Sequence, residues 1–324
     1  METAGGAGPI ADLARRLGGR TVWVITHEAP DGDAIGSVLA MSHLVRACGG
    51  DAVPLCADPV PAVYAFLPRS AEIKTAPPDR QVPAARIYVD CATGERAGPL
   101  YVAPAPGVRE INIDHHPSNT RFALLNWVDP ESSSTGEMVA HLYDLLGVGL
   151  AGAAEALYAA VVTDTGSFAF ESTVPATHRL AARLLEAGVS PGQFHSRIYE
   201  SREPAALVLL GRALRTLGYS AGGRIAHMVL TPQDFACAGA RGEHTDGIVN
   251  YARTVRGVEV GLLFFALGAD QVRVAIRTRT GVDASALAAR FGGGGHPRAA
   301  GCRLPPPLDD AVQRVLAAAG EALR

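Results

Sequence analysis

Apolar and polar positions in the first half of the chain alternate between strand-like and helix-like patterns. Three short apolar runs have the length of buried strands: residues 21–25, 86–90 and 108–113. Five longer stretches are typical of helices: residues 9–17, 34–48, 134–146, 151–162 and 177–187. Strands that alternate with helices predict a largely parallel sheet covered on both faces.

The pattern changes in the second half of the chain. Residues 191–217 predict a mostly helical connector that ends near Gly222-Gly223. The remaining elements form a second α/β set: strands at 224–230, 258–267 and 271–278, and helices at 283–291 and 308–323. We therefore expect an α/β protein in which a larger domain (1–188), a helical linker (189–222) and a smaller domain (223–324) follow one another.

Composition narrows the class of protein. The chain has 324 residues, of which 48% are apolar and 19% charged, as in a globular protein in water, and no apolar run approaches the ~18 residues of a membrane span. The five cysteines are scattered and form no Cys-x-x-Cys pair, which argues against a disulfide framework and against a thiolate zinc site. With no signal-peptide pattern at the N-terminus, we expect a cytoplasmic protein without a membrane partner.

Charge is divided unevenly between the two halves. Residues 1–222 hold 17 Lys and Arg against 23 Asp and Glu, whereas residues 223–324 hold 12 against 9. An acidic half that binds cations, joined to a basic half that binds anions, fits a phosphate substrate.

Six side chains with imidazole or carboxylate groups stand at the ends of predicted elements in the first domain. They are His27, Asp31, Asp33, Asp90, His115 and Asp164. Charged groups at such places are costly to bury without partners, and six ligands are too many for one tetrahedral zinc. Imidazole mixed with carboxylate suits Mn²⁺, so we expect two divalent ions, with Mn²⁺ the expected metal, if one Asp bridges them.

The doublet His115-His116 carries a geometric argument of its own. Successive side chains on an extended backbone point to opposite sides, so the two imidazoles should not bind the same ion. One is expected to ligate and the other to meet the substrate or move a proton. Asp114 is placed to orient a neighbouring imidazole.

The second domain contains a glycine run beside a basic strand. Four glycines at 292–295 precede His296 and Arg298, and this segment predicts a loop whose backbone N–H groups approach an anion. In the preceding strand, Arg273, Arg277 and Arg279 share the face opposite three apolar residues. Arginine is well shaped for bidentate contacts with phosphate.

Together these motifs resemble the DHH/DHHA1 phosphoesterase family over nearly the whole chain. The family has four characteristic motifs in its first domain. This chain resembles the first at His27-x-x-x-Asp31-x-Asp33, the second at Asp90, the third at Asp114-His115-His116 and the fourth at Asp164. Residues 292–301 resemble the substrate-binding motif of the DHHA1 domain, and Arg277-Thr278-Arg279 resembles its Arg-Ser-Arg element with Thr in place of Ser.

The resemblance implies specific roles. One metal site would hold His27, Asp31 and Asp90, and the other Asp33, Asp90, His115 and Asp164, with Asp90 as the bridge. His116 and Asp90 would be the catalytic residues. Substrate binding would fall to seven residues of the smaller domain: Arg277, Arg279, Gly293, Gly294, Gly295, His296 and Arg298.

Length and layout are most similar to the branch of the family that degrades very short RNA and often dephosphorylates 3′-phosphoadenosine 5′-phosphate. The expected partners are therefore short RNA oligonucleotides or small nucleotides, and the sequence leaves a homodimer open. Two alternatives remain at this point: a phosphodiesterase for cyclic di-AMP or pApA, and an inactive nucleotide sensor. A DNA repair nuclease is disfavoured because the chain has no room for the additional domain of the long nucleases.

Overall fold

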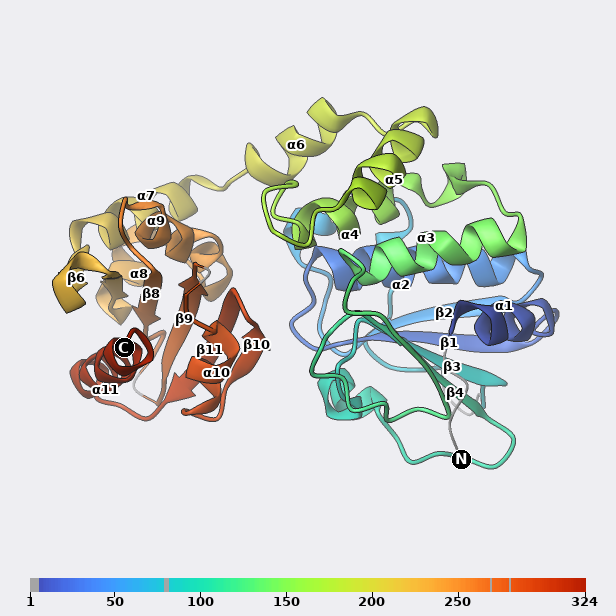
Figure 1. The fold of residues 1–324 in the computed structure, drawn as a ribbon, viewed down its shortest axis with the longest axis horizontal. Helices are drawn as coiled ribbons and strands as arrows, with labels where there is room; N and C mark the ends of the chain where they lie inside the picture. The colour runs from blue at the N-terminus through green and yellow to red at the C-terminus, as the bar shows by residue number, and fades with distance from the viewer. Residues whose placement is uncertain (1–5, 79–81, 269, 280) are drawn as a thin grey trace. The chain divides into compact units, whose positions relative to one another are not determined.

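The computed structural model describes residues 6–78, 82–268, 270–279 and 281–324, which form two compact units divided between Ser201 and Arg202. Figure 1 shows the elements of each unit. The strands of the first unit are β1 (Thr21–Thr26), β2 (Asp51–Cys56), β3 (Ala85–Val89), β4 (Arg109–Asp114) and β5 (Leu125–Val128). Its helices are α1 (Ala7–Arg15), α2 (Gly32–Ala47), α3 (Thr135–Leu146), α4 (Ala154–Asp164), α5 (Pro175–Glu186) and α6 (Pro191–Tyr199), with 3₁₀ segments η1 (Ala62–Tyr64), η2 (Ser70–Glu72), η3 (Gly94–Leu100) and η4 (Leu150–Gly152).

The sheet of the first unit is parallel throughout, in the order β2-β1-β3-β4-β5. Alternate residues of β1 face opposite sides, so Val22 and Val24 belong to the core under the helices, while Trp23 and Ile25 belong to a second cluster. Helices α2, α3 and α4 pack over the first side (Figure 1). Segment η3 and neighbouring aromatic rings cover the second side. Both sides are buried, which confirms the predicted α/β class with its parallel sheet.

Two strands of this sheet were not anticipated from the sequence. Strand β2 lies in the proline-punctuated region and contains Pro54. It is an edge strand, where the missing N–H of proline removes no bond from the ladder, and the Pro54 carbonyl accepts from the Lys74 N–H on the outer side (3.0 Å). Strand β5 has only four residues, which is too short for a clear alternation.

Helices α2 and α4 approach each other closely because α2 carries glycine at two positions one turn apart. A Cβ at Gly32 would overlap the Thr163 side chain, and a Cβ at Gly36 would overlap the Ala156 carbonyl oxygen. The close contact brings the start of α2, with Asp33, next to the end of α4, with Asp164.

We expect Gly36→Ala to lower the free energy of unfolding of the first unit by about 1–3 kcal/mol, because the added methyl group pushes two packed helices apart. Urea denaturation followed by circular dichroism measures this change. Gly192→Ala is the matched control, since a Cβ at that helical position meets nothing within 4 Å. Equal stability of the two variants would contradict the close-packing argument.

The second unit contains a mixed sheet in the order β10-β11-β9-β8-β7-β6, in which only β7 and β8 are parallel. The strands are β6 (Gly218–Ser220), β7 (Ile225–Leu230), β8 (Val260–Phe265), β9 (Val272–Thr278), β10 (Gly294–His296) and β11 (Ala299–Leu304). The helices are α7 (Pro204–Arg215), α8 (Pro232–Ala238), α9 (Ile248–Thr254), α10 (Ala284–Ala289) and α11 (Leu308–Ala322), with 3₁₀ segments η5 (Ala221–Gly223) and η6 (Gly242–Thr245). Among the described helices of either unit, none is long and apolar enough to cross a bilayer.

Candidate metal centre

The metal-ligand candidates of the first unit meet beyond the carboxyl ends of β1, β3 and β4. Because these strands are parallel neighbours, the residues that follow them share one edge of the sheet, which is where open α/β sheets bind ligands. Asp164 arrives from the last turn of α4. Two clusters result, each with ligand atoms within 4.8 Å of one another: His27, Asp31 and Asp90, and Asp33, His115 and Asp164.

The structure changes the expected setting of two residues. The helix after β1 was expected to begin at Ala34, but α2 already begins at Gly32. Asp31 is its N-cap, with Oδ1 accepting from the Ala34 N–H (3.0 Å), and Asp33 lies in the first turn. The capping bond holds one carboxylate oxygen of Asp31 in place and leaves the second oxygen for a ligand role.

Asp90 belongs to the first cluster and also approaches the second. Its Oδ2 is 3.3 Å from His27 Nε2, and its Oδ1 is 3.9 Å from His115 Nε2. The residue is 2% exposed and its backbone is left-handed, with φ of 60°, a conformation that Asp tolerates better than most residues. One carboxylate therefore offers an oxygen to each cluster, as a bridging ligand must.

The second cluster is tightly gathered around His115. Its Nε2 lies 3.2 Å from Asp164 Oδ2 and 3.8 Å from Asp33 Oδ2. The opposite ring nitrogen, Nδ1, lies 3.1 Å from the Ser132 carbonyl oxygen, which can only accept. We therefore assign the hydrogen to Nδ1, which leaves the lone pair of Nε2 for a cation.

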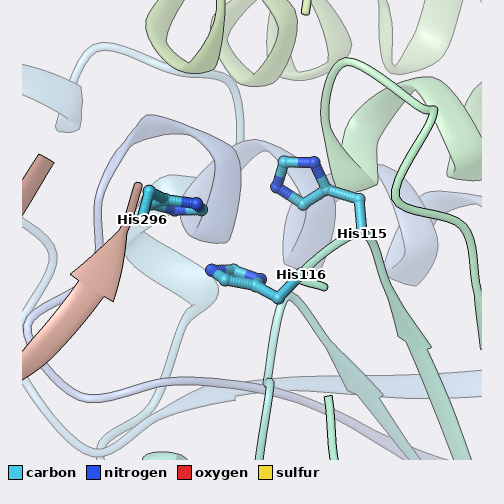
Figure 2. Close-up of side chains that lie close together, drawn as sticks. All are labelled: His115, His116 and His296. Atoms are coloured by element: carbon cyan, nitrogen blue, oxygen red, sulfur yellow. The ribbon is translucent and has the colours of Figure 1, made fainter. Parts of the chain in front are cut away.

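The rings of the two consecutive histidines extend to the same side of the chain (Figure 2), with centroids 5.1 Å apart and a nitrogen of each within 4.8 Å of one another, so they do not point to opposite sides as the sequence pattern predicted. The rings of His115 and His116 are inclined by 71°. His116 Nδ1 donates to Asp114 Oδ1 (2.7 Å), and Asp114 Oδ2 accepts from Asn119 Nδ2 (2.6 Å). Asp114 therefore orients His116, and Nε2 is the nitrogen that faces away from this carboxylate.

Electrostatics indicate that the centre needs cations. Burial, and then the charge of Asp90, raise the pKa of Asp33 well above its usual range. Burial also raises the pKa of Asp164, with Asp31 and Asp90 adding to it. Burial would likewise raise the pKa of Asp90, but the hydrogen bond to His27 and the nearby imidazoles reverse the direction and lower it. Buried carboxylates that repel one another in this way are stabilised by divalent cations.

The donor set fits such ions. All candidate ligand atoms are carboxylate oxygens or imidazole nitrogens, which suits Mn²⁺ and similar divalent metals. Two cysteines lie nearby, but Cys56 Sγ donates to the His27 carbonyl (3.3 Å) and Cys91 Sγ to the Val89 carbonyl (3.5 Å). Burial raises the pKa of the Cys56 thiol to about 11, so it is not a thiolate ligand.

The start of α3 supports both clusters and was missed by the sequence analysis. The backbone N–H groups of Thr135 and Gly136 donate to the two oxygens of Asp33 (2.7 and 2.9 Å), and the Thr135 hydroxyl donates to Asp90 Oδ1 (3.0 Å). Helix N-termini favour negative charge, which explains why an acidic centre forms there. The sequence signal was the run Ser132-Ser133-Ser134-Thr135, in which Ser134 is the N-cap.

We expect Thr135→Val to weaken Mn²⁺ binding by about 10- to 100-fold, because the variant keeps the shape and the backbone N–H but loses the hydroxyl that orients Asp90. Isothermal titration calorimetry measures this affinity. Thr163→Val is the matched control, since that hydroxyl donates only to backbone carbonyls of α4, at Ala159 and Ala160. The orienting role is wrong if both variants bind Mn²⁺ like the parent protein.

In the second unit, the glycine run differs from the expected loop. Gly294, Gly295 and His296 form β10, which pairs with β11 in a tight hairpin. Gly295 has φ of 142°, and a Cβ there would lie 2.7 Å from Ala300 Cα, while a Cβ at Gly293 would lie 2.5 Å from Cys302 Cβ. These two glycines are therefore required by the hairpin itself, whereas a Cβ at Gly294 would meet nothing within 4 Å.

The predicted arginines of the second unit lie on and beside β9. Buried and half-buried residues alternate along β9, as the sequence pattern indicates, with Arg273 and Arg277 at half-buried positions. Arg298 Nη1 donates to the carbonyls of Arg279 (2.7 Å) and Val282 (3.1 Å), so this nitrogen holds the turn after β9. Arg277 Nη1 donates to the neighbouring Ile276 carbonyl (3.0 Å).

Comparison with known proteins agrees with this layout. Residues 21–163 match the model of the DHH family, N-terminal domain, and residues 222–324 match that of the DHHA1 domain. The chain is 38% identical, over 97% of its length and 93% of the relative's, to the bifunctional oligoribonuclease and PAP phosphatase NrnA of Thermus thermophilus. It is 26% identical, over 88% and 89%, to the protein of the same name from Bacillus subtilis.

Solved structures share the fold. An exopolyphosphatase-related protein from Bacteroides fragilis superposes with a TM-score of 0.89 at 24% identity, covering 97% of this chain and 96% of that one. The structure of RecJ with Mn²⁺ from Thermus thermophilus superposes with a TM-score of 0.51 at 15% identity, covering 97% of this chain and 54% of that one. The chain, with a DHH domain followed by a DHHA1 domain, therefore belongs to the DHH family of phosphoesterases.

Proposed function

We propose that this phosphoesterase hydrolyses short RNA oligonucleotides to mononucleotides and also dephosphorylates 3′-phosphoadenosine 5′-phosphate, with two Mn²⁺ ions as its cofactors. The observation that carries the proposal is Asp90, which offers one carboxylate oxygen to each of two ligand clusters. The names of the relatives from Thermus thermophilus and Bacillus subtilis support the choice of substrates.

The residues present would divide the metal-binding work. One ion would be held by His27, Asp31 and Asp90, and the other by Asp33, Asp90, His115 and Asp164. Two divalent ions supply charge neutralisation of the phosphoryl group and an activated water. Asp90 keeps the two groups of ligands at a fixed spacing, and the first turn of α3 keeps Asp33 and Asp90 oriented.

His116 would handle the proton. Burial alone lowers the pKa of an imidazole, but the hydrogen bond to Asp114 and the charge of Asp90 raise the pKa of His116 to about 9. The ring is therefore protonated near neutral pH, and its Nε2–H can donate to the oxygen that leaves the phosphoryl group.

The second unit would bind the substrate, as the family resemblance implies. Arg277, Arg279 and His296 would bind a phosphate of the substrate, with Gly293, Gly294, Gly295 and Arg298 shaping the binding segment. Only 6% of the residues are aromatic, which does not favour an extended base-stacking surface, so substrates of a few nucleotides fit better than long strands.

The test is a hydrolysis panel with metal-stripped protein that is resupplied with Mn²⁺. The panel contains a 5′-phosphorylated RNA dinucleotide, a long single strand, cyclic di-AMP and 3′-phosphoadenosine 5′-phosphate. We expect fast turnover of the dinucleotide and of the bisphosphate and slow turnover of the long strand. Turnover of cyclic di-AMP alone would replace the proposal with a cyclic dinucleotide phosphodiesterase, and no turnover with Mn²⁺ bound would indicate a nucleotide sensor.

A further inference from the structure

Arg96 is a cationic side chain beside the first ligand cluster that the proposed mechanism has not used. It lies in η3, the 3₁₀ segment that follows β3 and Asp90. Two contacts fasten this segment to the residues after β1: the Glu28 N–H donates to the Arg96 carbonyl (2.8 Å), and the Glu28 side chain packs against Gly98. Gly98 has φ of 57° and lacks the Cβ that would overlap this carboxylate.

The guanidinium of Arg96 lies close to a metal-ligand candidate. Its Nη2 is 3.2 Å from His27 Nδ1, and the residue is exposed. The same Nδ1 is 2.8 Å from the Glu28 carbonyl oxygen, an atom that can only accept. When His27 ligates through Nε2, Nδ1 therefore carries the hydrogen that this carbonyl receives, and the ring offers no acceptor to Arg96.

Arg96 also lacks a carboxylate partner among the residues that the structure describes, since no Asp or Glu oxygen in these ranges lies within 4.0 Å of it. Three other arginines of the first unit are paired with carboxylates: Arg46 and Arg69 with Glu72, and Arg86 with Glu110. A guanidinium has five N–H donors in a planar fork that matches phosphate oxygens. Arg96 is thus a cation at an acidic centre with most of its donors available.

We propose that Arg96 binds oxygens of the phosphoryl group that is hydrolysed, on the His27 side of the metal centre, and is a further catalytic residue of this enzyme. The inference rests on the proposed phosphoester hydrolysis at this centre. Arg96 would add a charge-assisted hydrogen bond to the phosphoryl group, which the metal ions also bind, at the place where negative charge accumulates.

The test compares Arg96→Ala with the parent protein by calorimetric titration. We expect the affinity of the Mn²⁺-loaded protein for inorganic phosphate to fall by about 10- to 100-fold, which is the range for a hydrogen bond to a charged group. The affinity for Mn²⁺ itself should stay within about twofold. Arg96→Lys, which keeps the charge but not the fork, should recover part of the phosphate affinity.

Arg109→Ala is the matched control, because Arg109 is an exposed arginine at the opposite end of the same sheet, at the start of β4. Unchanged phosphate affinity in Arg96→Ala would overturn the proposal. A loss of Mn²⁺ affinity with phosphate binding intact would also overturn it and would make Arg96 a support for His27. Phosphate titration does not depend on which nucleotide is the substrate, so a failure of the hydrolysis panel would be distinguishable from a failure here.

Discussion

Asp90→Asn is expected to reduce Mn²⁺-dependent turnover by at least about 1,000-fold, which is more than the 10- to 100-fold typical of residues that only support a ligand. The substitution removes the charge and one carboxylate oxygen from the residue that belongs to the first cluster and approaches His115 of the second. Asn also tolerates the left-handed backbone found at this position, so the fold is preserved better than with Ala. Steady-state kinetics give the loss of turnover, and calorimetry gives the number of Mn²⁺ ions bound, which should fall below two.

The control for this variant is Asp58→Asn. Asp58 is exposed and follows β2 at the same edge of the sheet, and its Oδ2 accepts from the Ala29 N–H (2.6 Å) rather than joining either ligand cluster. Asp58→Asn should leave the turnover number within a few-fold of that of the parent protein. If Asp90→Asn still binds two ions and retains a tenth of the activity, Asp90 is not the bridge.

His116→Gln is expected to lower kcat by about 10²- to 10⁴-fold, the range for loss of a general acid, while Mn²⁺ affinity stays nearly unchanged. The pH profile adds a second criterion. Because the pKa of His116 is raised, the donating form dominates at low pH and is lost as pH rises through that pKa. The parent enzyme should therefore lose kcat on the alkaline side, and the variant should lack this limb.

His141→Gln controls for the change of side chain, since His141 is an exposed residue of α3 whose ring packs near Trp127. An alkaline limb that persists in His116→Gln would assign the titration to another group. A large drop in Mn²⁺ affinity would instead place His116 among the metal ligands.

The residue pattern predicted the α/β class and three of the parallel strands of the first unit, because the signals for these strands are local. Buried parallel strands read as short apolar runs, and the ligand candidates follow directly after them, so their meeting at one edge is a consequence of strand order. The prediction for the glycine run in the second unit was less accurate, because a loop was expected and part of the run forms β10. Two of its glycines are explained by close backbone approach within a hairpin, a requirement that depends on β11 and cannot be seen in the run itself.

The sequence did not predict which groups support the candidate metal ligands. Thr135 is distant from both Asp33 and Asp90 along the chain, and only the packing of α3 against α2 brings it to them. Arg96 likewise reaches His27 because η3 turns back over the residues after β1. Neither contact produces a periodic pattern in the sequence, since each is made by a single side chain, Thr135 at the start of α3 and Arg96 within η3.

The ligands that gather around Asp90 come from segments spread between His27 and Asp164, and no two consecutive strands supply a complete set. A zinc finger captures its ion with a short stretch of chain and folds around it, whereas this centre exists only after a parallel sheet of high contact order has been assembled. The proposed metal ions would therefore bind only after this sheet has formed. A nascent chain on the ribosome that has not yet released α4 already contains His27, Asp31 and Asp90 but lacks Asp164, so the first cluster can be completed before the second.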